Sequence, residues 1–464
     1  MTMPSPVHDG LPTPRRYWAI VAIGLAITMA VLDSAIANVA LPTISRDLNA
    51  SAAASIWVIN AYQIAIVIAL LPLASLGEIV GFRRVYQAGL IVFTLASIAC
   101  FSANSIFTLS LARVLQGLGA AGILSVNGAL VRFTYPPRLL GRAIGINAVI
   151  ISLAAAAGPT IAGAVLAVGH WRWLFGLNVP IGIVAIAIAA FALPANPLQK
   201  RSLNWVGALL NAAAFGLVIS GLQAVAHGDA PAVPMLVFAV GLGAGVLLFL
   251  HERGRAAPLI PLDLLAKPMF SLSVATSIIS FTAQMMSFVS LPFFFQATLG
   301  LDAVQTGLLM TPWPLATMIT APLAGSLSDR YSAGVLGAIG LSVFAAGLVS
   351  LSLLHHGASN IDIIVRVGLC GAGFGFFQSP NNRAMMSEAP LIRSGAAGGM
   401  LGTARTLGQS LGAVVVAFLL GSAPTGGVSN GFVLAAVLAL FGAVMSGSRI
   451  RRQKADPEAQ VDAV

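Results

Sequence analysis

The stretch YWAIVAIGLAITMAVLDSAIANVAL, residues 17–41, decides the fold class. Its one charged side chain is Asp33. A helix of about 20 apolar residues crosses the roughly 30 Å hydrocarbon core of a bilayer. Strands of a membrane β-barrel alternate apolar and polar residues, and this stretch does not alternate. It therefore predicts a transmembrane helix.

The rest of the chain has the same character. Of its 464 residues, 58% are hydrophobic and 8% are charged, whereas soluble domains carry about 25% charged residues. This composition excludes an ordinary soluble globular protein. The net charge of +10 would suggest nucleic acid in a soluble protein. In a membrane protein, basic residues gather in cytoplasmic loops, so we expect no nucleic-acid partner.

Apolar runs between charged and Pro/Gly-rich breaks predict fourteen membrane helices. They lie near residues 17–41, 56–77, 84–104, 106–130, 140–168, 173–193, 205–226, 233–250, 269–294, 304–326, 333–354, 361–382, 395–420 and 430–447. The fold class is therefore all-α integral membrane, and the chain is multi-pass.

The basic residues predict the orientation of these helices. If both termini and every second loop are cytoplasmic, those segments carry 19 of the 24 Lys and Arg residues, and the opposite loops carry only Arg46 and Arg172. This positive-inside bias predicts cytoplasmic termini. The first 16 residues contain no apolar core of a cleavable signal peptide, so we expect the first helix to remain as an anchor in a bacterial inner membrane.

Two distant segments resemble each other and indicate an internal repeat. ASLGE at 74–78 is followed by Gly81 and the pair Arg83-Arg84, and GSLSDR at 325–330 places a carboxylate at the same spacing. Two six-helix halves are typical of transporters. We predict tails at 1–16 and 448–464, halves at 17–193 and 269–447, and a linker at 194–268 with two additional membrane helices.

Several motifs together resemble one family. Gly145, Gly158-Pro159 and Gly163 follow the antiporter signature of the major facilitator superfamily, with two glycines of that signature replaced by alanine. LDSAIANVALP at 32–42, the run Trp171-Arg172-Trp173 and the two inserted helices are similar to its fourteen-span drug:proton antiporter branch. The resemblance extends from about residue 17 to 447. Ala74, Glu78 and Phe82 depart from the usual loop after the second helix.

Asp33 and Arg113 are the main candidates for proton coupling. They fall at similar depth in the first and fourth predicted helices, and two opposite charges in a low dielectric stabilise each other. Ionisable groups inside membrane helices indicate function by default. The resemblance implies roles in proton and substrate coupling for both residues, while a purely structural salt bridge is the alternative.

Other candidates fall into three groups. The resemblance implies that the antiporter motif, Gly145, Gly158, Pro159 and Gly163, seals the cavity against leak. A cytoplasmic gate is predicted at Glu78, Gly81, Arg83, Arg84, Asp329 and Arg330, with a simple solvated loop as the alternative. The substrate cavity is predicted to include Asn38, Asn60, Tyr62, Gln63, Gln284, Met285, Phe288, Trp313, Phe377, Arg405 and Gln409. Core packing and helix–helix hydrogen bonds are the alternatives for this last group.

The sequence thus favours a proton-driven multidrug antiporter that exports lipophilic monocations or zwitterions by alternating access. We expect no cofactor beyond the proton gradient, no metal and no enzymatic activity, because neither a phosphate-binding loop nor a catalytic set is visible. The expected partners are lipophilic small molecules, protons and membrane lipids, with the monomer as the functional unit. The alternatives are a dedicated exporter of one metabolite or antibiotic, a non-transporting membrane enzyme or receptor, and uptake by symport.

Overall fold

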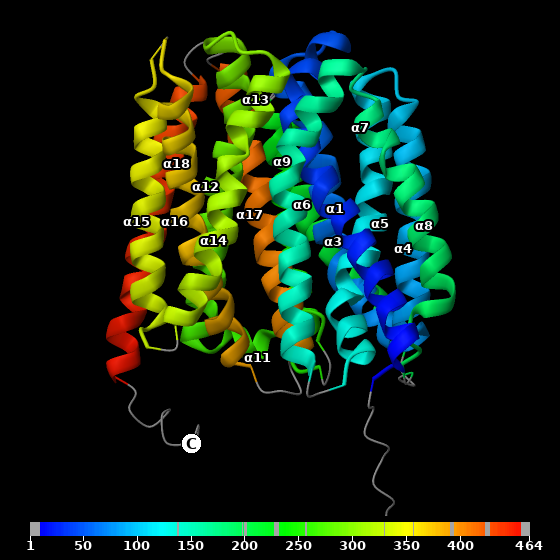
Figure 1. The fold of residues 1–464 in the computed structure, drawn as a ribbon. Helices are drawn as coiled ribbons and strands as arrows, with labels where there is room; N and C mark the ends of the chain where they lie inside the picture. The colour runs from blue at the N-terminus through cyan, green and yellow to red at the C-terminus, as the bar shows by residue number, and fades with distance from the viewer. Residues whose placement is uncertain are drawn as a thin grey trace, which may run out of the picture.

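The computed structural model describes residues 10–136, 139–196, 198, 202–226, 232–255, 258–328, 330–355, 357–389, 394–422 and 427–455. The regular elements in these ranges are all helices. They stand side by side as a bundle (Figure 1), and 13 helices among the described residues are long and apolar enough to cross a membrane.

The first half of the chain forms one group of packed helices. Its long members are α1 (Thr13–Asp47), α3 (Trp57–Val80), α4 (Phe82–Phe101), α5 (Ile106–Thr134), α6 (Leu140–Val168) and α8 (Asn178–Ala192), and its short ones are α2 (Ala52–Ser55) and α7 (Trp173–Gly176). Gly81 separates α3 from α4 with a φ of 109°, a backbone conformation that favours glycine.

The second group is built from the last third of the chain. It holds α11 (Leu262–Leu265), α12 (Pro268–Phe293), a π-helical turn (Phe294–Thr298), α13 (Ala303–Met310), α14 (Pro312–Leu327), α15 (Ala333–Ser352), α16 (Asn360–Ser387), α17 (Ser394–Ser422) and α18 (Gly427–Ala455). We call the two groups the N-terminal group and the C-terminal group.

A helical hairpin lies between the two groups in sequence. Its helices are α9 (Trp205–Ala226) and α10 (Ala232–Glu252). α9 packs against α3 and α17, one helix from each group, whereas α10 packs on α9. Asn204 closes the hairpin by donating a 2.6 Å hydrogen bond to the buried Glu252 carboxylate.

The predicted helix at 304–326 is divided in the structure, and the fourteen-span count is not confirmed. α13 has 8 residues and α14 has 16, with Thr311 between them. Pro312 and Pro314 lack the backbone N–H groups that would continue the hydrogen-bond ladder, which explains the division at this point.

α18 continues to Ala455, so the first residues of the predicted C-terminal tail at 448–464 are helical. Arg449, expected in that tail, is fully buried inside the C-terminal group. Its guanidinium donates hydrogen bonds to Ser273 and Asn381, both of 2.9 Å, and to Ser446 at 3.1 Å. Neutral oxygen acceptors from three helices therefore hold this arginine.

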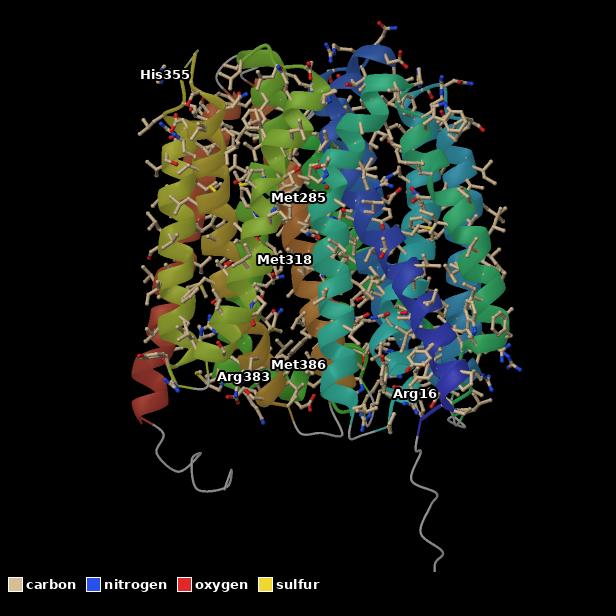
Figure 2. The ribbon with its side chains drawn as sticks, viewed as in Figure 1. Arg16, Met285, Met318, His355, Arg383 and Met386 are labelled. Atoms are coloured by element: carbon tan, nitrogen blue, oxygen red, sulfur yellow. The ribbon has the colours of Figure 1, made fainter. Side chains whose placement is uncertain are left out.

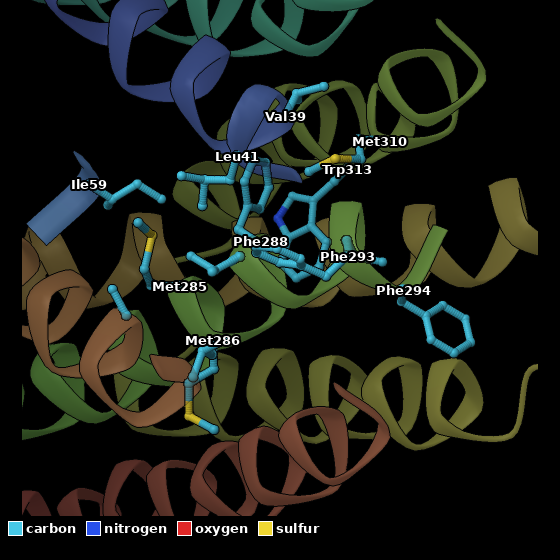
Figure 3. Packing of buried hydrophobic residues seen from close by; sticks show 14 of the residues in the cluster. Val39, Leu41, Ile59, Met285, Met286, Phe288, Phe293, Phe294, Met310 and Trp313 are labelled. Carbon is cyan, nitrogen blue, oxygen red and sulfur yellow. The ribbon is translucent and has the colours of Figure 1, made fainter. Parts of the chain in front are cut away.

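The beginning of α1 and the end of α18 lie at the same end of the bundle, the lower end in Figure 1, which we call the terminal end. Arg16 and Arg383 lie there and His355 lies at the opposite, distal end (Figure 2). At the distal end both groups share one hydrophobic core, where Leu41 of α1 meets Phe288 and Trp313 (Figure 3).

Toward the terminal end the groups have separate cores. One cluster lies wholly in the N-terminal group and includes Tyr86 and Leu130. Another lies wholly in the C-terminal group and includes Phe270 and Met385. Apolar packing thus holds the groups together mainly at the distal end.

Candidate functional site

Asp33 and Arg113 meet inside the N-terminal group. Asp33 comes from α1 and Arg113 from α5, and a guanidinium nitrogen of Arg113 donates to the Asp33 carboxylate. Their exposed fractions are 2% and 1%. The sequence predicted similar depths for the two residues, and the structure brings their charges into direct contact.

Neutral side chains complete this cluster. The second carboxylate oxygen of Asp33 accepts hydrogen bonds from the amides of Gln116, at 2.9 Å, and Asn178, at 2.8 Å. Gln116 also donates to Ser97 at 2.9 Å, and the Nε of Arg113 donates to the Val58 carbonyl at 2.9 Å. Burying a charge pair is costly unless additional hydrogen bonds satisfy it, and these four contacts supply them.

Tyr62 of α3 covers the pair on the side of the other group. Its ring centre lies 4.1 Å from the Arg113 guanidinium carbon, which is a cation–π contact. The Tyr62 hydroxyl donates to the Ala30 carbonyl at 3.1 Å. Arg405 of α17 is the cation of the C-terminal group that lies close enough to interact electrostatically with Tyr62. Tyr62 therefore contacts the buried pair and lies near Arg405 of α17.

A polar contact joins the two groups beside Tyr62. The amide nitrogen of Gln63 in α3 donates to the Gln409 amide oxygen in α17 at 3.2 Å. Arg405, one turn earlier, is half-buried and makes no hydrogen bond or ion pair within the described part of the chain. Arg405 and Gln409 share a helix face, as their spacing predicted, and Gln409 meets Gln63 at the interface of the groups.

The other predicted polar residues make different contacts. Asn38 donates to the Ser34 carbonyl of its own helix at 2.8 Å. Asn60 donates to Gln223 of α9 at 2.6 Å, so it contributes to a helix–helix hydrogen bond. The Gln284 amide oxygen is buried and has no hydrogen-bond partner among the described residues.

The predicted apolar lining is mostly packed core. Met285, Phe288 and Trp313 belong to the shared distal core, and the Phe288 and Trp313 rings meet edge to face at 5.4 Å. Phe377 is fully buried between α15 and α16 against Phe374. Its placement inside the C-terminal group does not fit a cavity between the groups.

Two glycines of the predicted antiporter motif lie where α6 comes close to neighbouring helices. A Cβ on Gly158 would lie 2.4 Å from the Cβ of Ala35 in α1, and one on Gly163 would lie 3.2 Å from Val304 in α13. The Pro159 carbonyl would lie 2.2 Å from a Cβ on Gly307. α6 therefore touches both groups through small residues. Gly145 is in α6, but its side-chain surroundings are outside the described part.

The predicted gate is only partly recovered. Arg83 donates to the Ala190 carbonyl at the end of α8, and Arg84 donates to the Val80 carbonyl at 3.2 Å. Both arginines thus donate to carbonyls within the N-terminal group, and the latch between the groups stays a prediction. Helix C-termini favour cations, which explains these contacts.

The remaining gate residues differ in their surroundings. Glu78 is half-buried in the last turns of α3, and Arg330 is exposed. Asp329 lies outside the described residues. Arg383 of α16 donates to the Ser328 hydroxyl at 2.9 Å on the same loop.

Sequence reasoning missed the neutral partners of the site. Gln116 follows Arg113 by three residues, a spacing that puts both on one helix face, and this signal could have identified it. Asn178 follows Trp171-Arg172-Trp173 in the run that resembles the drug:proton antiporter branch, but only the packing of α8 on α1 shows that it meets Asp33. Ser97 gave no signal, and it joins the cluster through Gln116. The buried charged residues Glu252 and Arg449 were not among the predicted candidates either, because they lie at helix ends.

The chain matches known transporters over nearly its full length. The family model of the Major Facilitator Superfamily matches residues 23–413. An uncharacterized transporter of Escherichia coli (strain K12), YebQ, is 51% identical over 97% of this chain and 99% of its own.

Two further relatives carry functional names. The riboflavin transporter RibZ of Clostridioides difficile (strain 630) is 30% identical over 86% of this chain and 87% of its own. The multidrug resistance protein Stp of Mycobacterium tuberculosis (strain CDC 1551 / Oshkosh) is 31% identical over 86% of this chain and 75% of its own. With its helical bundle and its full-length match, this chain belongs to the Major Facilitator Superfamily of membrane transporters, which are not enzymes.

Proposed function

We propose that this protein is a proton-coupled exporter of small lipophilic compounds that works by alternating access as a monomer. Protons would enter through Asp33, and their inward movement would drive substrate outward. The terminal end of the bundle would face the cytoplasm of a bacterial cell, and α13 and α14 would together make the fourteenth span of the drug:proton antiporter branch.

The observation that carries this proposal is the enclosure of Asp33. Its carboxylate is held by Arg113, Gln116 and Asn178 and is nearly inaccessible to solvent. Protonation would remove the negative charge and leave Arg113 buried without a counter-ion, which is unfavourable. The helices α1, α5 and α8 would then have to rearrange, so the proton could drive a conformational change.

The packing of the groups supports alternating access. A shared core at the distal end and separate cores at the terminal end are expected of a state closed on one side. Opening the distal end requires α6 to separate from α13, and the contacts there are made by Gly163, Gly307 and the hydroxyl pair Thr160–Thr311 at 2.7 Å. Glycine at two of these positions lets the helices approach without an interposed side chain, which favours their reversible separation.

The substrates are proposed from chemistry and from the relatives. The name of Stp supports multidrug export, whereas that of RibZ supports a transporter dedicated to one metabolite. We favour lipophilic substrates of some variety because the groups meet at Tyr62, Met285 and Phe288, whose aromatic and thioether surfaces accept many ligand shapes.

Proton-coupled transport in proteoliposomes tests the proposal. A pH-sensitive dye inside the vesicles reports proton movement when ethidium and other lipophilic compounds are added. The wild type is expected to give a signal that Asp33→Asn abolishes. Asp362→Asn is the matched control, because Asp362 pairs with Arg366 at 2.7 Å near a helix end, and it should behave like wild type.

Two results would count against this function. Proton movement in Asp33→Asn equal to that of the wild type would reduce Asp33 to a structural role. A response restricted to a single compound in a broad panel would favour the dedicated metabolite exporter.

A further inference from the structure

One face of α17 is directed at the N-terminal group. Gly398, Gly402, Arg405 and Gln409 recur at intervals of three and four residues, so they lie on one side of the helix. A Cβ on Gly402 would lie 3.6 Å from Leu70 of α3, and Gln409 bonds to Gln63 of α3. Arg405, between these two positions, therefore lies at the boundary between the groups.

The charge of Arg405 has no counter-ion in the described part of the chain. Two other arginines inside helices have a counter-ion, since Arg113 pairs with Asp33 and Arg366 pairs with Asp362. The buried Arg449 has none there either, but neutral acceptors of the C-terminal group hold its guanidinium. Arg405 is half-buried, with Thr403, Ala404 and Thr406 around it buried. Of the four residues 403–406, Arg405 is the one that is not fully buried.

The balance of charge at this boundary is positive. While Asp33 is ionised it neutralises Arg113, which leaves the single positive charge of Arg405 beside Tyr62. In a medium of low dielectric, such a charge attracts an anion and repels a second cation strongly. A guanidinium also presents paired N–H donors that match the two oxygens of a carboxylate.

We propose that Arg405 binds the anionic group of a zwitterionic substrate, with the amides of Gln63 and Gln409 beside it. This inference rests on the proposed function and narrows its substrates, because a simple monocation meets an uncompensated positive charge at this position. An ammonium elsewhere in the same substrate is attracted toward Asp33 only while that carboxylate is ionised. Protonation of Asp33 then weakens binding, as antiport requires.

Matched pairs of compounds test this assignment. Norfloxacin carries a carboxylate and an ammonium group, and its methyl ester keeps only the ammonium; rhodamine B and its ethyl ester form a second pair. Transport of each compound is measured in proteoliposomes with an imposed pH gradient. The wild type is expected to transport the carboxylate forms about tenfold better than the esters, since charge-assisted hydrogen bonds are among the strong ones.

Variants of Arg405 separate recognition from folding. Arg405→Gln is expected to abolish the preference for the carboxylate forms, and Arg405→Lys to keep a smaller one, because it retains the charge without the paired donors. Arg366→Gln, which removes an arginine far from this boundary, should keep the ratio of the wild type. A single monodisperse peak in gel filtration checks that each variant is folded.

The possible results are distinct. Equal transport of acid and ester by the wild type, or an unchanged ratio in Arg405→Gln, would overturn the role of Arg405. Proton-coupled transport of ethidium without transport of either carboxylate compound would also overturn it, while supporting the proposed function. Transport of none of these compounds, together with no proton signal, would overturn both.

Discussion

At the scale of single residues, the structure centres on one carboxylate and the groups that hold it. Asp33 has a charged partner from α5 and neutral donors from α5 and α8. The charged pair could be predicted from the sequence, because ionisable residues are rare inside membrane helices and their depths can be counted. Of the neutral residues, Gln116 could be inferred from its spacing to Arg113, whereas only three-dimensional packing selects Asn178 and Ser97, because amides and hydroxyls are common in helices.

Removing one member of the Asp33–Arg113 pair should lower the free energy of unfolding more than removing both. Arg113→Gln leaves Asp33 buried without its counter-ion, and we expect a loss of about 3–5 kcal/mol in the free energy of unfolding. Adding Asp33→Asn to this variant should restore part of that loss, because a neutral amide is easier to bury than a lone carboxylate. Unfolding of the purified protein in detergent measures both changes.

The half-exposed pair Asp362–Arg366 is the control for this comparison. The same exchange of Arg366 for Gln should cost only about 0.3–0.5 kcal/mol, the usual value for a helix pair four residues apart. If the double variant at Asp33 and Arg113 is less stable than Arg113→Gln alone, the two charges do not compensate each other in the way described.

At the scale of helices, the sequence predicted most of the elements, but it missed one break and ended the last helix too early. Long apolar runs made the membrane helices visible, since lipid allows few alternatives to a helix. The break at Thr311 lies within an apolar run and could be inferred only from Pro312 and Pro314. The end of α18 was misjudged because Arg449, Arg451 and Arg452 look like a solvated tail, whereas basic residues also stabilise the last turn of a helix.

The contact between α6 and α13 gives a prediction at this scale. In Gly307→Ala the new Cβ would lie 2.2 Å from the Pro159 carbonyl, so the two helices must move apart at the distal end. A cysteine placed at Thr160 should then react faster with a maleimide than it does in the parent protein, by several-fold. The measurement is the rate of labelling in membranes.

Gly243→Ala is the matched control, because no atom lies within 4 Å of a Cβ at that position in α10. It should leave the labelling rate unchanged and leave the fold intact, since alanine is a better helix former than glycine. An unchanged rate in Gly307→Ala as well would mean that this glycine contact does not hold the distal end closed.

At the scale of the whole molecule, the two ends of the bundle differ in charge and in packing. Arg15, Arg16, Arg83 and Arg84 lie at the beginnings of α1 and α4 on the terminal end, where the cores of the groups are separate. The distal end carries Arg46 and Arg172 and the shared core. The difference in charge between the two ends could be predicted by counting basic residues in the sequence. The difference in packing could not, because it depends on contacts between residues far apart in the chain.

Reporter fusions test the proposed orientation. Green fluorescent protein fused after the C-terminus should fluoresce in a bacterial host, because it folds in the cytoplasm, and alkaline phosphatase at the same place should be inactive. Alkaline phosphatase fused after Asn104, between α4 and α5 at the distal end, should be active. The reverse pattern would mean that the terminal end faces away from the cytoplasm. The proposed inward proton movement would then lose its basis.

The contacts of the inserted hairpin determine how short the connecting segment to the C-terminal group is. α9 is tied to α3 by two buried amide contacts, Asn60–Gln223 at 2.6 Å and Asn211 to the Ile68 carbonyl at 2.9 Å. Glu252 then accepts a 2.6 Å hydrogen bond from the Leu259 backbone N–H, so the restraint extends from the hairpin to Leu259.

Leu264, only five residues later, is already buried in the core of the C-terminal group. The covalent connection from the hairpin to the C-terminal group is therefore a few residues around Pro261, and in the proposed alternating access it would serve as the joint. A joint this short acts as a pivot: it permits rotation of one body on the other while allowing little sliding between them. Most of the linker expected from the sequence is the helical hairpin, whose helix α9 packs against both groups.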